Sequence, residues 1–357
     1  MDFFKKIISR TLLYKQYASL KFDFNYNKIF AVKGRVRLAK KMIPKSSKVI
    51  WVGINKNSDE SGLLNGLKKT FNTKVYYLNK STYGLGNNSN YDYNKIQVIS
   101  NKFFGDIKAM HNQKKVDIII GQFMGINIDS LTLNKIKNLG IKVVSLSWDD
   151  KLTFLWKKDY KKSCHSISKS IDYVLCSSID ALPKYKNGFF FPLGSSKEIF
   201  YSNTDSNKKV DILFVGNNYG FRGKVIKFLV KKGYNVRCYG NGFDKGFINY
   251  LDAAKEFGSA KIILGIGYVS YSKKITTLKL RDFDSMISGG LYITSFNEEL
   301  NYLFGNAIPY YKNLNQLDSI LKYYLSNDKE RELLAKKQQK SIIGKYEWEN
   351  LFAKLSY

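Results

Sequence analysis

The feature that most constrains the fold is an alternation of short apolar runs with longer amphipathic stretches, beginning at residue 48. The runs are strand-sized and bounded by turn-forming residues, as in KVIWVGI over 48–54 and VDILFVG over 210–216. Such runs are typical of strands buried on both faces, and the stretches between them are typical of helices that cover a parallel sheet. The pattern therefore predicts an α/β fold with parallel sheets.

The strands predicted from this pattern are 48–54, 74–79, 116–123, 142–148, 172–178, 188–194, 210–216, 235–240, 260–267, 291–296 and 307–311. The predicted helices between and after them lie near 60–71, 101–114, 129–139, 155–170, 221–232, 246–257 and 275–288, in a short stretch up to 304, and in three terminal segments.

The length of 357 residues predicts two domains, because a domain has about 150 residues. The polar, turn-forming stretch SSKEIFYSNTDSNKK is the best linker between them. We expect two Rossmann-like, doubly wound domains that face a cleft, with ligands beyond the carboxyl ends of the strands. The expected segments are a basic N-terminal segment (1–45), an N-terminal domain (46–194), a linker (195–209), a C-terminal domain (210–343), and a last helix that can cross back to the first domain (344–357).

The net charge of +30 comes from 59 Lys and Arg against 29 Asp and Glu. A charge of this size attracts polyanions, anionic lipid surfaces and phosphorylated substrates. Residues 1–45 hold twelve of the basic residues and only two acidic ones. Within this segment, residues 2–13 have the pattern of a basic amphipathic helix, which can lie on an anionic bilayer or pack on the domain as an ordinary surface helix.

Several classes of protein do not fit the composition. Three cysteines without a CxxC spacing fit a reducing compartment, and only two histidines are present, so a zinc site is not expected. No apolar run reaches the roughly 20 residues that a membrane-spanning helix needs, and basic residues interrupt the N-terminal apolar stretch, unlike a signal peptide. We expect a cytoplasmic protein, in contact with the inner face of the cell membrane if the basic helix binds lipid.

The loop VGNNYGFRGK over 215–224 joins a predicted strand to a predicted helix. Gly216 and Asn217 lie in the turn, and Arg222 and Lys224 lie at the start of the helix. Small residues let the backbone approach a ligand, and the amides of a helix N-terminus with two cations can neutralise a diphosphate. The spacing is neither a P-loop nor a GxGxxG motif, and an ordinary strand-to-helix turn also uses glycine.

The helix over 275–288, LKLRDFDSMISGG at its carboxyl end, carries an opposed charge pair on an otherwise apolar stripe. Asp284 could accept hydrogen bonds from two ribose hydroxyls, and Arg281, one turn earlier, could reach phosphates. The loop that ends at Gly240 belongs to the same carboxyl edge of the second sheet. Alternatively, Arg281 and Asp284 form a surface ion pair, which contributes only about 0.2–0.5 kcal/mol.

These segments resemble the C-terminal half of the spore-maturation-type glycosyltransferases, which are nucleotide-sugar enzymes of the two-domain GT-B fold. The helix of that family reads Leu-Arg-x-Phe-Glu-x-x-x-x-Gly, and its Glu binds the donor's ribose. Arg281, Phe283 and Gly289 match this pattern, and Asp284 stands in place of the Glu with a shorter reach. The likeness covers roughly residues 115–305 and is more specific in the second domain.

Two further motifs carry the resemblance. The turn that leads to Arg222 is similar to the family's Val-Gly-x-x-x-x-x-Arg turn, and SWDDKLTF over 147–154 is similar to its Trp-x-Asp-Asp segment. The resemblance implies a hexosyltransferase-like enzyme that moves a sugar from a nucleotide diphosphate donor to a glycan or lipid-linked acceptor. Polysaccharide or glycolipid synthesis at the cell envelope is the implied setting, and neither a cofactor nor an essential metal is implied.

The expected roles follow from the chemistry of the leaving group. Arg222 and Lys224, with Arg281 as auxiliary, would stabilise the negative charge that develops on the departing nucleoside diphosphate. An inverting reaction needs a base near the acceptor hydroxyl, for which we select Asp149 or Asp150. The alternative is that these aspartates cap the following helix. The two histidines fall on predicted helices, where packing is the expected role.

Two other classes of function remain open from the sequence. One is a basic nucleic-acid-binding protein, although no zinc-finger, RNP or helix-turn-helix signature occurs and no specific nucleic acid is expected. The other is a catalytically inactive subunit that keeps the transferase fold to bind a partner.

Overall fold

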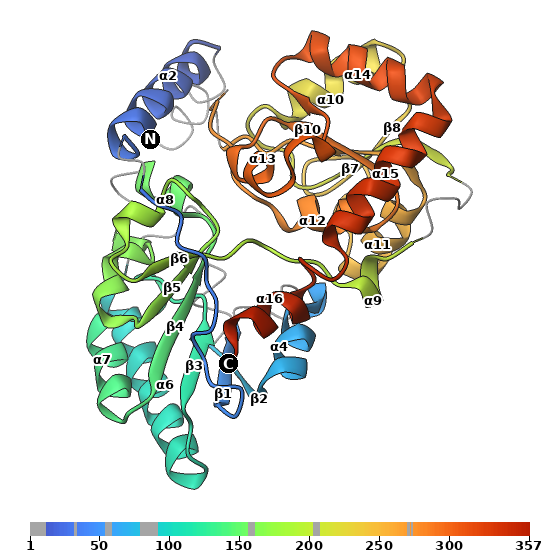
Figure 1. Cartoon of the computed structure of the whole chain (residues 1–357). Coiled ribbons are helices and arrows are strands. Elements are labelled where there is room, and N and C mark those ends of the chain that lie inside the picture. Colours follow the sequence, from blue (N-terminus) through green and yellow to red (C-terminus); the bar gives the residue numbers. More distant parts are fainter. Residues whose placement is uncertain are drawn as a thin grey trace. The chain divides into compact units, whose positions relative to one another are not determined.

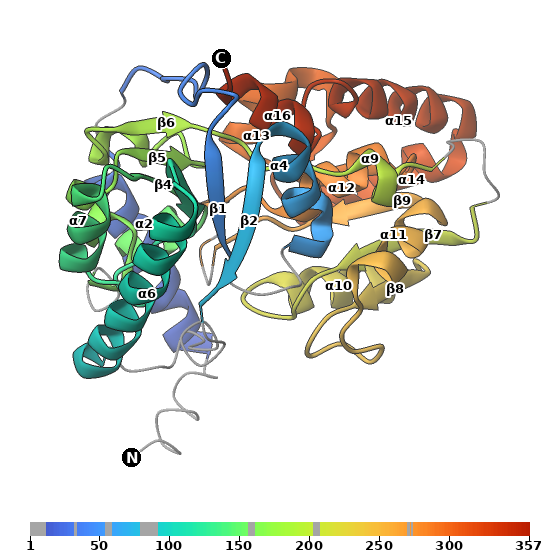
Figure 2. The ribbon, with the colours of Figure 1, turned by 90° about the horizontal axis from the view of Figure 1, so that it is seen from below.

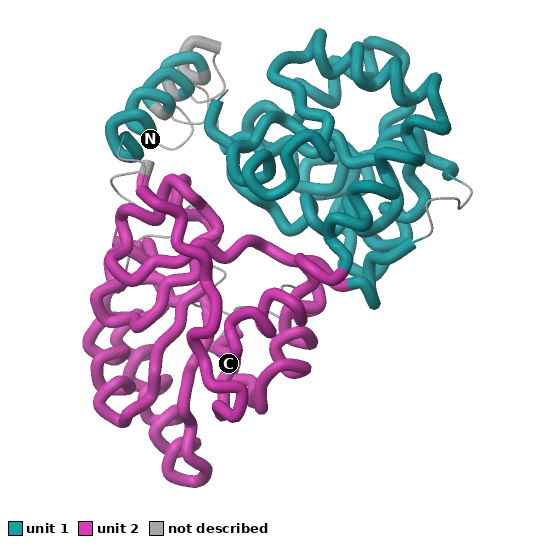
Figure 3. The backbone as a smooth tube through the Cα atoms, in the orientation of Figure 1, with its two compact units in different colours: residues 1–31, 197–343 teal, residues 32–196, 344–357 magenta. Residues whose placement is uncertain are grey.

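A computed structural model gives the structure of the chain and describes residues 12–31, 34–53, 59–78, 92–155, 161–202, 208–269, 272 and 274–357. The chain divides into two compact units, shown in Figure 3. Unit 1 comprises residues 1–31 and 197–343, and unit 2 comprises residues 32–196 and 344–357. The chain thus passes between the units at three points, after residues 31, 196 and 343.

Unit 2 is built on a six-stranded parallel sheet in the order β2-β1-β3-β4-β5-β6, visible in Figure 1. Its strands are β1 (Lys48–Gly53), β2 (Asn72–Tyr77), β3 (Ile118–Gly121), β4 (Lys142–Ser147), β5 (Tyr173–Cys176) and β6 (Gly188–Phe190). The central strands β3 and β4 are buried except for Lys142 at the start of β4, which explains why their sequences are largely apolar.

The helices of unit 2 lie on both sides of this sheet, α6 and α7 on one side and α4 with α16 on the other (Figure 1). The helical segments are η1 (Asp59–Leu63), α4 (Leu64–Thr70), α6 (Tyr93–Gln113), α7 (Ser130–Asn138), α8 (Asp150–Leu155), η3 (His165–Ser170), η4 (Leu182–Lys184) and α16 (Trp348–Leu355). The C-terminal helix α16 packs directly against α4, although α4 lies early in the sequence of this unit.

Unit 1 contains a five-stranded parallel sheet in the order β11-β10-β9-β7-β8. Its strands are β7 (Val210–Val215), β8 (Val236–Tyr239), β9 (Ala260–Gly265), β10 (Leu291–Ser295) and β11 (Tyr310–Tyr311). Its helical segments are α2 (Leu12–Ile29), α9 (Lys197–Phe200), α10 (Arg222–Lys231), α11 (Tyr250–Gly258), α12 (Leu280–Ile287), α13 (Glu298–Phe304), η5 (Gly305–Ala307), α14 (Leu314–Ser326) and α15 (Asp328–Ile342). Figure 2 shows the same elements from below.

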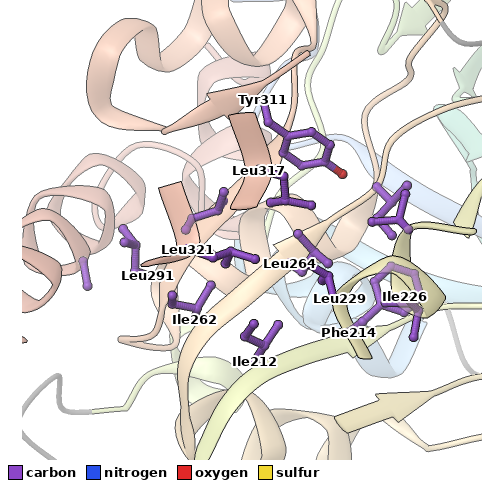
Figure 4. Close-up of a cluster of buried hydrophobic side chains, with 14 residues drawn as sticks. Ile212, Phe214, Ile226, Leu229, Ile262, Leu264, Leu291, Tyr311, Leu317 and Leu321 are labelled. Atoms are coloured by element: carbon purple, nitrogen blue, oxygen red, sulfur yellow. The ribbon is translucent and has the colours of Figure 1, made fainter. Parts of the chain in front are cut away.

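A hydrophobic cluster joins the sheet of unit 1 to the helices on one of its faces, as Figure 4 shows. Alternate residues of β7 and β9, such as Ile212 and Ile262, point into it. Leu229 of α10 and Leu317 of α14 belong to the same cluster. Burial of each such side chain contributes about 1.5–3 kcal/mol, so this cluster holds α10 and its N-terminus firmly on the sheet.

Every strand predicted from the apolar runs is confirmed, with boundaries that shift by a few residues. The single helix predicted near 155–170 is wrong in its second half, where residues 161–170 form short 3₁₀ turns. Serine side chains explain the difference, because they compete for the backbone groups that a helix would pair. The Ser166 hydroxyl donates to the carbonyls of Lys161 and Ser163, and the Ser168 hydroxyl donates to that of His165.

The basic helix predicted over 2–13 falls almost entirely on residues 1–11, which lie outside the described part of the chain. Among the helices that are described, none combines the length and the apolar character needed to cross a membrane.

The contact between α4 and α16 yields a prediction, because Gly66 leaves no room for a side chain. A methyl group at this position would meet the backbone nitrogen of Glu349 at 2.7 Å and the Cβ of Trp348 at 2.6 Å. We expect Gly66→Ala to lower the free energy of unfolding of unit 2 by about 1–3 kcal/mol, the usual effect of overpacking. Urea denaturation followed by tryptophan fluorescence measures the change.

Gly105→Ala on α6 is the matched control, since a methyl group there meets no atom within 4 Å. In a helix this substitution is stabilising by up to about 1 kcal/mol. Equal destabilisation by both substitutions would contradict the packing of α16 on α4.

Candidate functional site

The topology of unit 1 selects one edge of its sheet for ligand binding. From β7 the chain moves to β8 on one side, then returns to β9 on the other side of β7. In open parallel sheets this reversal leaves a crevice at the carboxyl ends of the two strands where it occurs. The loops that follow Val215 and Gly265 are therefore where a ligand of unit 1 should bind.

Two glycines shape the loop that follows β7. Gly216 has φ = 152° and Gly240, after β8, has φ = 129°, a region that favours glycine. The loops are joined by hydrogen bonds from Gly216 N to Tyr239 O at 2.8 Å and from Asn241 N to the side chain of Asn217 at 3.1 Å. A side chain on Gly240 would collide with the carbonyl of Gly216, so this close approach of two backbones requires glycine.

Arg222 begins α10 and its guanidinium lies beneath this loop, almost fully buried. Its Nη1 donates to the carbonyl of Asn217 at 2.9 Å. The guanidinium carbon lies 4.0 Å from the ring centroid of the exposed Tyr219 and 5.7 Å from that of Phe214. The backbone and two aromatic faces thus fix its position, and its Nε is buried without a hydrogen-bond partner.

Arg281 of α12 reaches the same place from a distant part of the sequence. Its Nη1 donates to the carbonyl of Val215, the last residue of β7, and its guanidinium lies 4.9 Å from the ring centroid of Phe214. The Nε and Nη2 atoms are buried and have no hydrogen-bond partner. A side chain on Gly216 would collide with Arg281, which is the second reason for glycine at that position.

Two like charges are therefore held on one aromatic ring at the carboxyl end of β7. Burial, together with the positive charge of Arg281, lowers the pKa of Arg222 to about 10. Within the described residues neither guanidinium forms an ion pair with a carboxylate. The nearby Asp282 carboxylate offsets part of this positive charge. Two buried cations exceed one carboxylate, so the arrangement favours an anion bound by both side chains. We call Arg222, Arg281, Gly216 and the N-terminus of α10 the arginine site.

The other sequence-predicted residues of unit 1 are placed as follows. Asp284 is 2% exposed and Arg281 is 9% exposed, so they are not a surface ion pair. Lys224 is exposed on the first turn of α10, and Asn217 braces the loop and accepts from Arg222. The structure brings Gly216, Asn217, Arg222, Arg281 and Gly240 together through these contacts.

Asp282 is a neighbour of the arginine site that the sequence analysis missed. Its fully buried carboxylate accepts from the hydroxyl of Tyr292 at 2.5 Å and from the backbone nitrogen of Lys279 at 2.7 Å. Burial raises its pKa, while the nearby Arg281 charge works in the opposite direction. Asp282 fixes the N-terminus of α12 and hence the position from which Arg281 extends.

In unit 2, Asp149 and Asp150 follow the carboxyl end of β4, as predicted, but in different environments. Asp150 is fully buried and accepts from the hydroxyls of Tyr185 at 2.5 Å and Ser147 at 2.8 Å and from the thiol of Cys176 at 3.0 Å. Burial raises its pKa. Asp149 is exposed, and its carbonyl accepts the first backbone bonds of α8, as a helix-capping residue does.

The two histidines make packing contacts. His165 lies 5.2 Å from Phe154 and 5.5 Å from Tyr185 between ring centroids, and its Nε2 is 3.0 Å from the carbonyl of Lys184. Burial lowers the pKa of His165. The Nδ1 of His111 is 3.2 Å from the backbone nitrogen of Val116, which closes the end of α6.

Sequence reasoning also missed Asp59. The strand order places the reversal of unit 2 between β1 and β3, and Asp59 begins η1 shortly after the end of β1. Its carboxylate accepts from the indole of Trp51 and the hydroxyl of Tyr77, both at 2.8 Å, and burial raises its pKa. The sequence contained one signal for this residue: an Asp that comes just after the polar loop following the first strand.

The carboxyl-terminal part of the chain matches a known family. Residues 222–356 match the model of a family described as glycosyl transferase-like. The match begins at Arg222 and includes Arg281, so both arginines of the site lie within it. No curated protein sequence matches the chain.

Solved structures similar to the chain over both units include glycosyltransferases. A glycosyltransferase from Rickettsia africae has a TM-score of 0.59 at 12% identity, covering 87% of this chain and 97% of that protein. An alpha-glucosyltransferase in complex with UDP and DNA has a TM-score of 0.55 at 10% identity (85% and 96%). The lipopolysaccharide outer core galactosyltransferase WaaB has a TM-score of 0.52 at 12% identity (86% and 97%). These likenesses confirm the fold class: the chain has the GT-B fold, two Rossmann-like parallel-sheet domains.

The burial of Asp150 predicts a characteristic pH dependence of stability. Its pKa is higher in the folded than in the unfolded state, where it is about 3.9, so stability falls as pH rises through this interval. Asp150→Asn removes the titration. Relative to the wild type, we expect the variant to gain up to about 1.4 kcal/mol for each pH unit within the interval, and then to level off.

Denaturant midpoints measured from about pH 4, near the pKa of an unfolded Asp, to about pH 8 test this prediction. Asp149→Asn, which removes an exposed carboxylate one residue away, controls for the change of net charge. Parallel stability curves for Asp150→Asn and the wild type would show that Asp150 does not titrate abnormally.

Proposed function

We propose that the chain is a glycosyltransferase that moves a sugar from a nucleoside diphosphate donor to an acceptor hydroxyl. The observation that carries the proposal is the arginine site, where two buried guanidinium groups without a carboxylate partner lie at the predicted ligand-binding edge of unit 1. A diphosphate matches this arrangement, because it offers two adjacent anionic groups to two planar donors.

The arginine site suits the departure of the leaving group. When the bond between sugar and diphosphate breaks, negative charge grows on the phosphate oxygens, and fixed cations stabilise this charge without reorganising. The amides at the N-terminus of α10 add their partial positive charge, since no side chain caps this helix end. Lys224, exposed on the same turn, can approach the diphosphate from the solvent side. We propose that these groups serve in place of an essential metal ion.

Asp284 is proposed to bind the ribose of the donor, as the resemblance to spore-maturation-type glycosyltransferases implies. It lies on α12, one turn after Arg281, which supports a role beside the phosphates. The likeness to that particular family also suggests the acceptor. We propose a glycan or lipid-linked acceptor in the synthesis of a cell-surface polysaccharide or glycolipid.

An inverting reaction would need a base, and the candidates Asp59, Asp149 and Asp150 differ in their environments. Asp150 is fully engaged by three donors in the interior, which fits a structural role. Asp149 is exposed, and Asp59 lies at the strand reversal with its pKa raised towards the range that suits a base. We propose Asp59 as the base and retain Asp149 as the alternative.

The arginine site predicts which nucleotides and side chains govern binding. In a thermal-shift panel of UDP, GDP, dTDP and CMP, we expect one diphosphate to stabilise the chain, by about 2.7 kcal/mol at a concentration near 100 times its Kd. Arg222→Ala and Arg281→Ala should each weaken its binding about 10- to 100-fold, because each removes charged hydrogen bonds. Lys227→Ala, an exposed cation on the same helix, is the control and should bind normally.

A folded protein that binds none of these nucleotides would refute the proposal. Salt-sensitive binding of duplex DNA with no nucleotide binding would instead favour the nucleic-acid-binding alternative.

The choice of base predicts a pH effect on the rate. If Asp59 must be ionised to accept the acceptor's proton, kcat/KM rises with pH through its raised pKa. Asp59→Asn should remove this limb and lower kcat by about 10²- to 10⁴-fold while leaving nucleotide binding intact. If Asp149→Asn abolishes the limb and Asp59→Asn does not, the assignment to Asp59 is wrong.

A further inference from the structure

Helix α2 presents an apolar face to the solvent. Tyr17, Leu20 and Phe24 are 60%, 72% and 70% exposed. They are spaced three and four residues apart, so they lie on one side of the helix. Single exposed apolar residues are ordinary, but three large ones aligned on one helix form an apolar surface that is exposed in the described part of the chain.

The opposite side of α2 shows that this orientation is fixed. Ser19 and Phe30 are buried, and the carboxylate of Asp23 accepts a hydrogen bond from the hydroxyl of Ser272 at 2.6 Å. The rings of Tyr26 and Phe30 lie 5.0 Å apart between centroids, which steadies the carboxyl end of the helix. The buried residues and the bond to Ser272 therefore lie on the side of α2 opposite to Tyr17 and Phe24.

Lysines flank the apolar residues on the exposed side. Lys21 and Lys28 are exposed, and they continue the stripe of Tyr17 and Phe24 at helical spacing. The Nζ of Lys21 lies 5.7 Å from the centroid of the Tyr17 ring. We call Tyr17, Leu20, Lys21, Phe24 and Lys28 the outer face of α2.

The sequence that follows α2 is also basic, although most of it belongs to unit 2. Residues 30–45 contain six Lys or Arg and no Asp or Glu. The one acidic residue of α2, Asp23, is turned to the other side by its bond to Ser272. The outer face thus combines bulky apolar groups with cations and carries no anion, which is complementary to an anionic surface with an apolar interior.

We propose that the outer face of α2 binds the surface of a bilayer containing anionic lipids. Leu20 and Phe24 enter the boundary between headgroups and acyl chains, the amphipathic Tyr17 stays at headgroup level, and Lys21 and Lys28 contact lipid phosphates. A helix that lies in the interface of a membrane needs both apolar and basic side chains on the face that meets the lipid. A protein that bound the same face would need a surface with anionic groups among apolar ones. The inference does not depend on the arginine site.

Vesicle flotation of the full chain tests the proposal. Wild-type protein should float with phosphatidylcholine vesicles containing about 30 mol% phosphatidylglycerol, should not float with pure phosphatidylcholine, and should dissociate in high salt. Leu20→Glu/Phe24→Glu should lower the partition coefficient at least tenfold. Its thermal-shift response to nucleotide should equal that of the wild type, which shows that the variant is folded and separates this test from that of the arginine site.

Val98→Glu/Leu333→Glu is the matched control, because it replaces residues that are 71% and 66% exposed on other helices and changes the net charge equally. It should float like the wild type. The proposal is overturned if the α2 variant floats as well as the wild type, or if the control loses binding to the same extent. It is also overturned if the wild-type protein does not bind vesicles and light scattering shows that it forms a dimer which the α2 variant cannot form.

Discussion

The interaction on which the rest depends is the crowding of two guanidinium groups over the ring of Phe214. Arg222 and Arg281 are 59 positions apart in the sequence, counted as 281 − 222. Backbone carbonyls at the end of β7 hold them in place, and glycine at 216 makes room for both. Two buried like charges are unfavourable by themselves, and an anion bound between them removes the penalty. The function of the site is therefore inferred from a positive charge that the described carboxylates offset only in part.

Each of the two sheets has one strand reversal, and charged residues follow it in both units. In unit 1 the strand reversal is lined by cations, which suit a phosphorylated donor. In unit 2 the corresponding reversal is followed by Asp59, a buried carboxylate whose pKa is raised and which suits proton transfer. The proposed function assigns stabilisation of the leaving group to the arginine site and acceptance of the proton to Asp59.

The fold was largely predictable because parallel strands are buried on both faces and leave short, almost purely apolar runs. The local sequence pattern also indicated the turn at Gly216 and the position of Arg222 at the start of a helix. It could not reveal that Arg281 bonds to Val215, since this contact depends on how α12 docks on the sheet. Likewise, side-chain hydrogen bonds from serine ended the helix predicted near 155–170. Asp150 looked equivalent to its neighbour Asp149 in the sequence, and only tertiary packing separates their environments.

The most direct measurement of the central claim is a crystal structure of the chain with a bound nucleoside diphosphate. The account predicts phosphate oxygens within about 3 Å of guanidinium nitrogens of both Arg222 and Arg281, and near the first amides of α10. A diphosphate bound elsewhere, with both arginines still bonded only to the carbonyls of Asn217 and Val215, would contradict it.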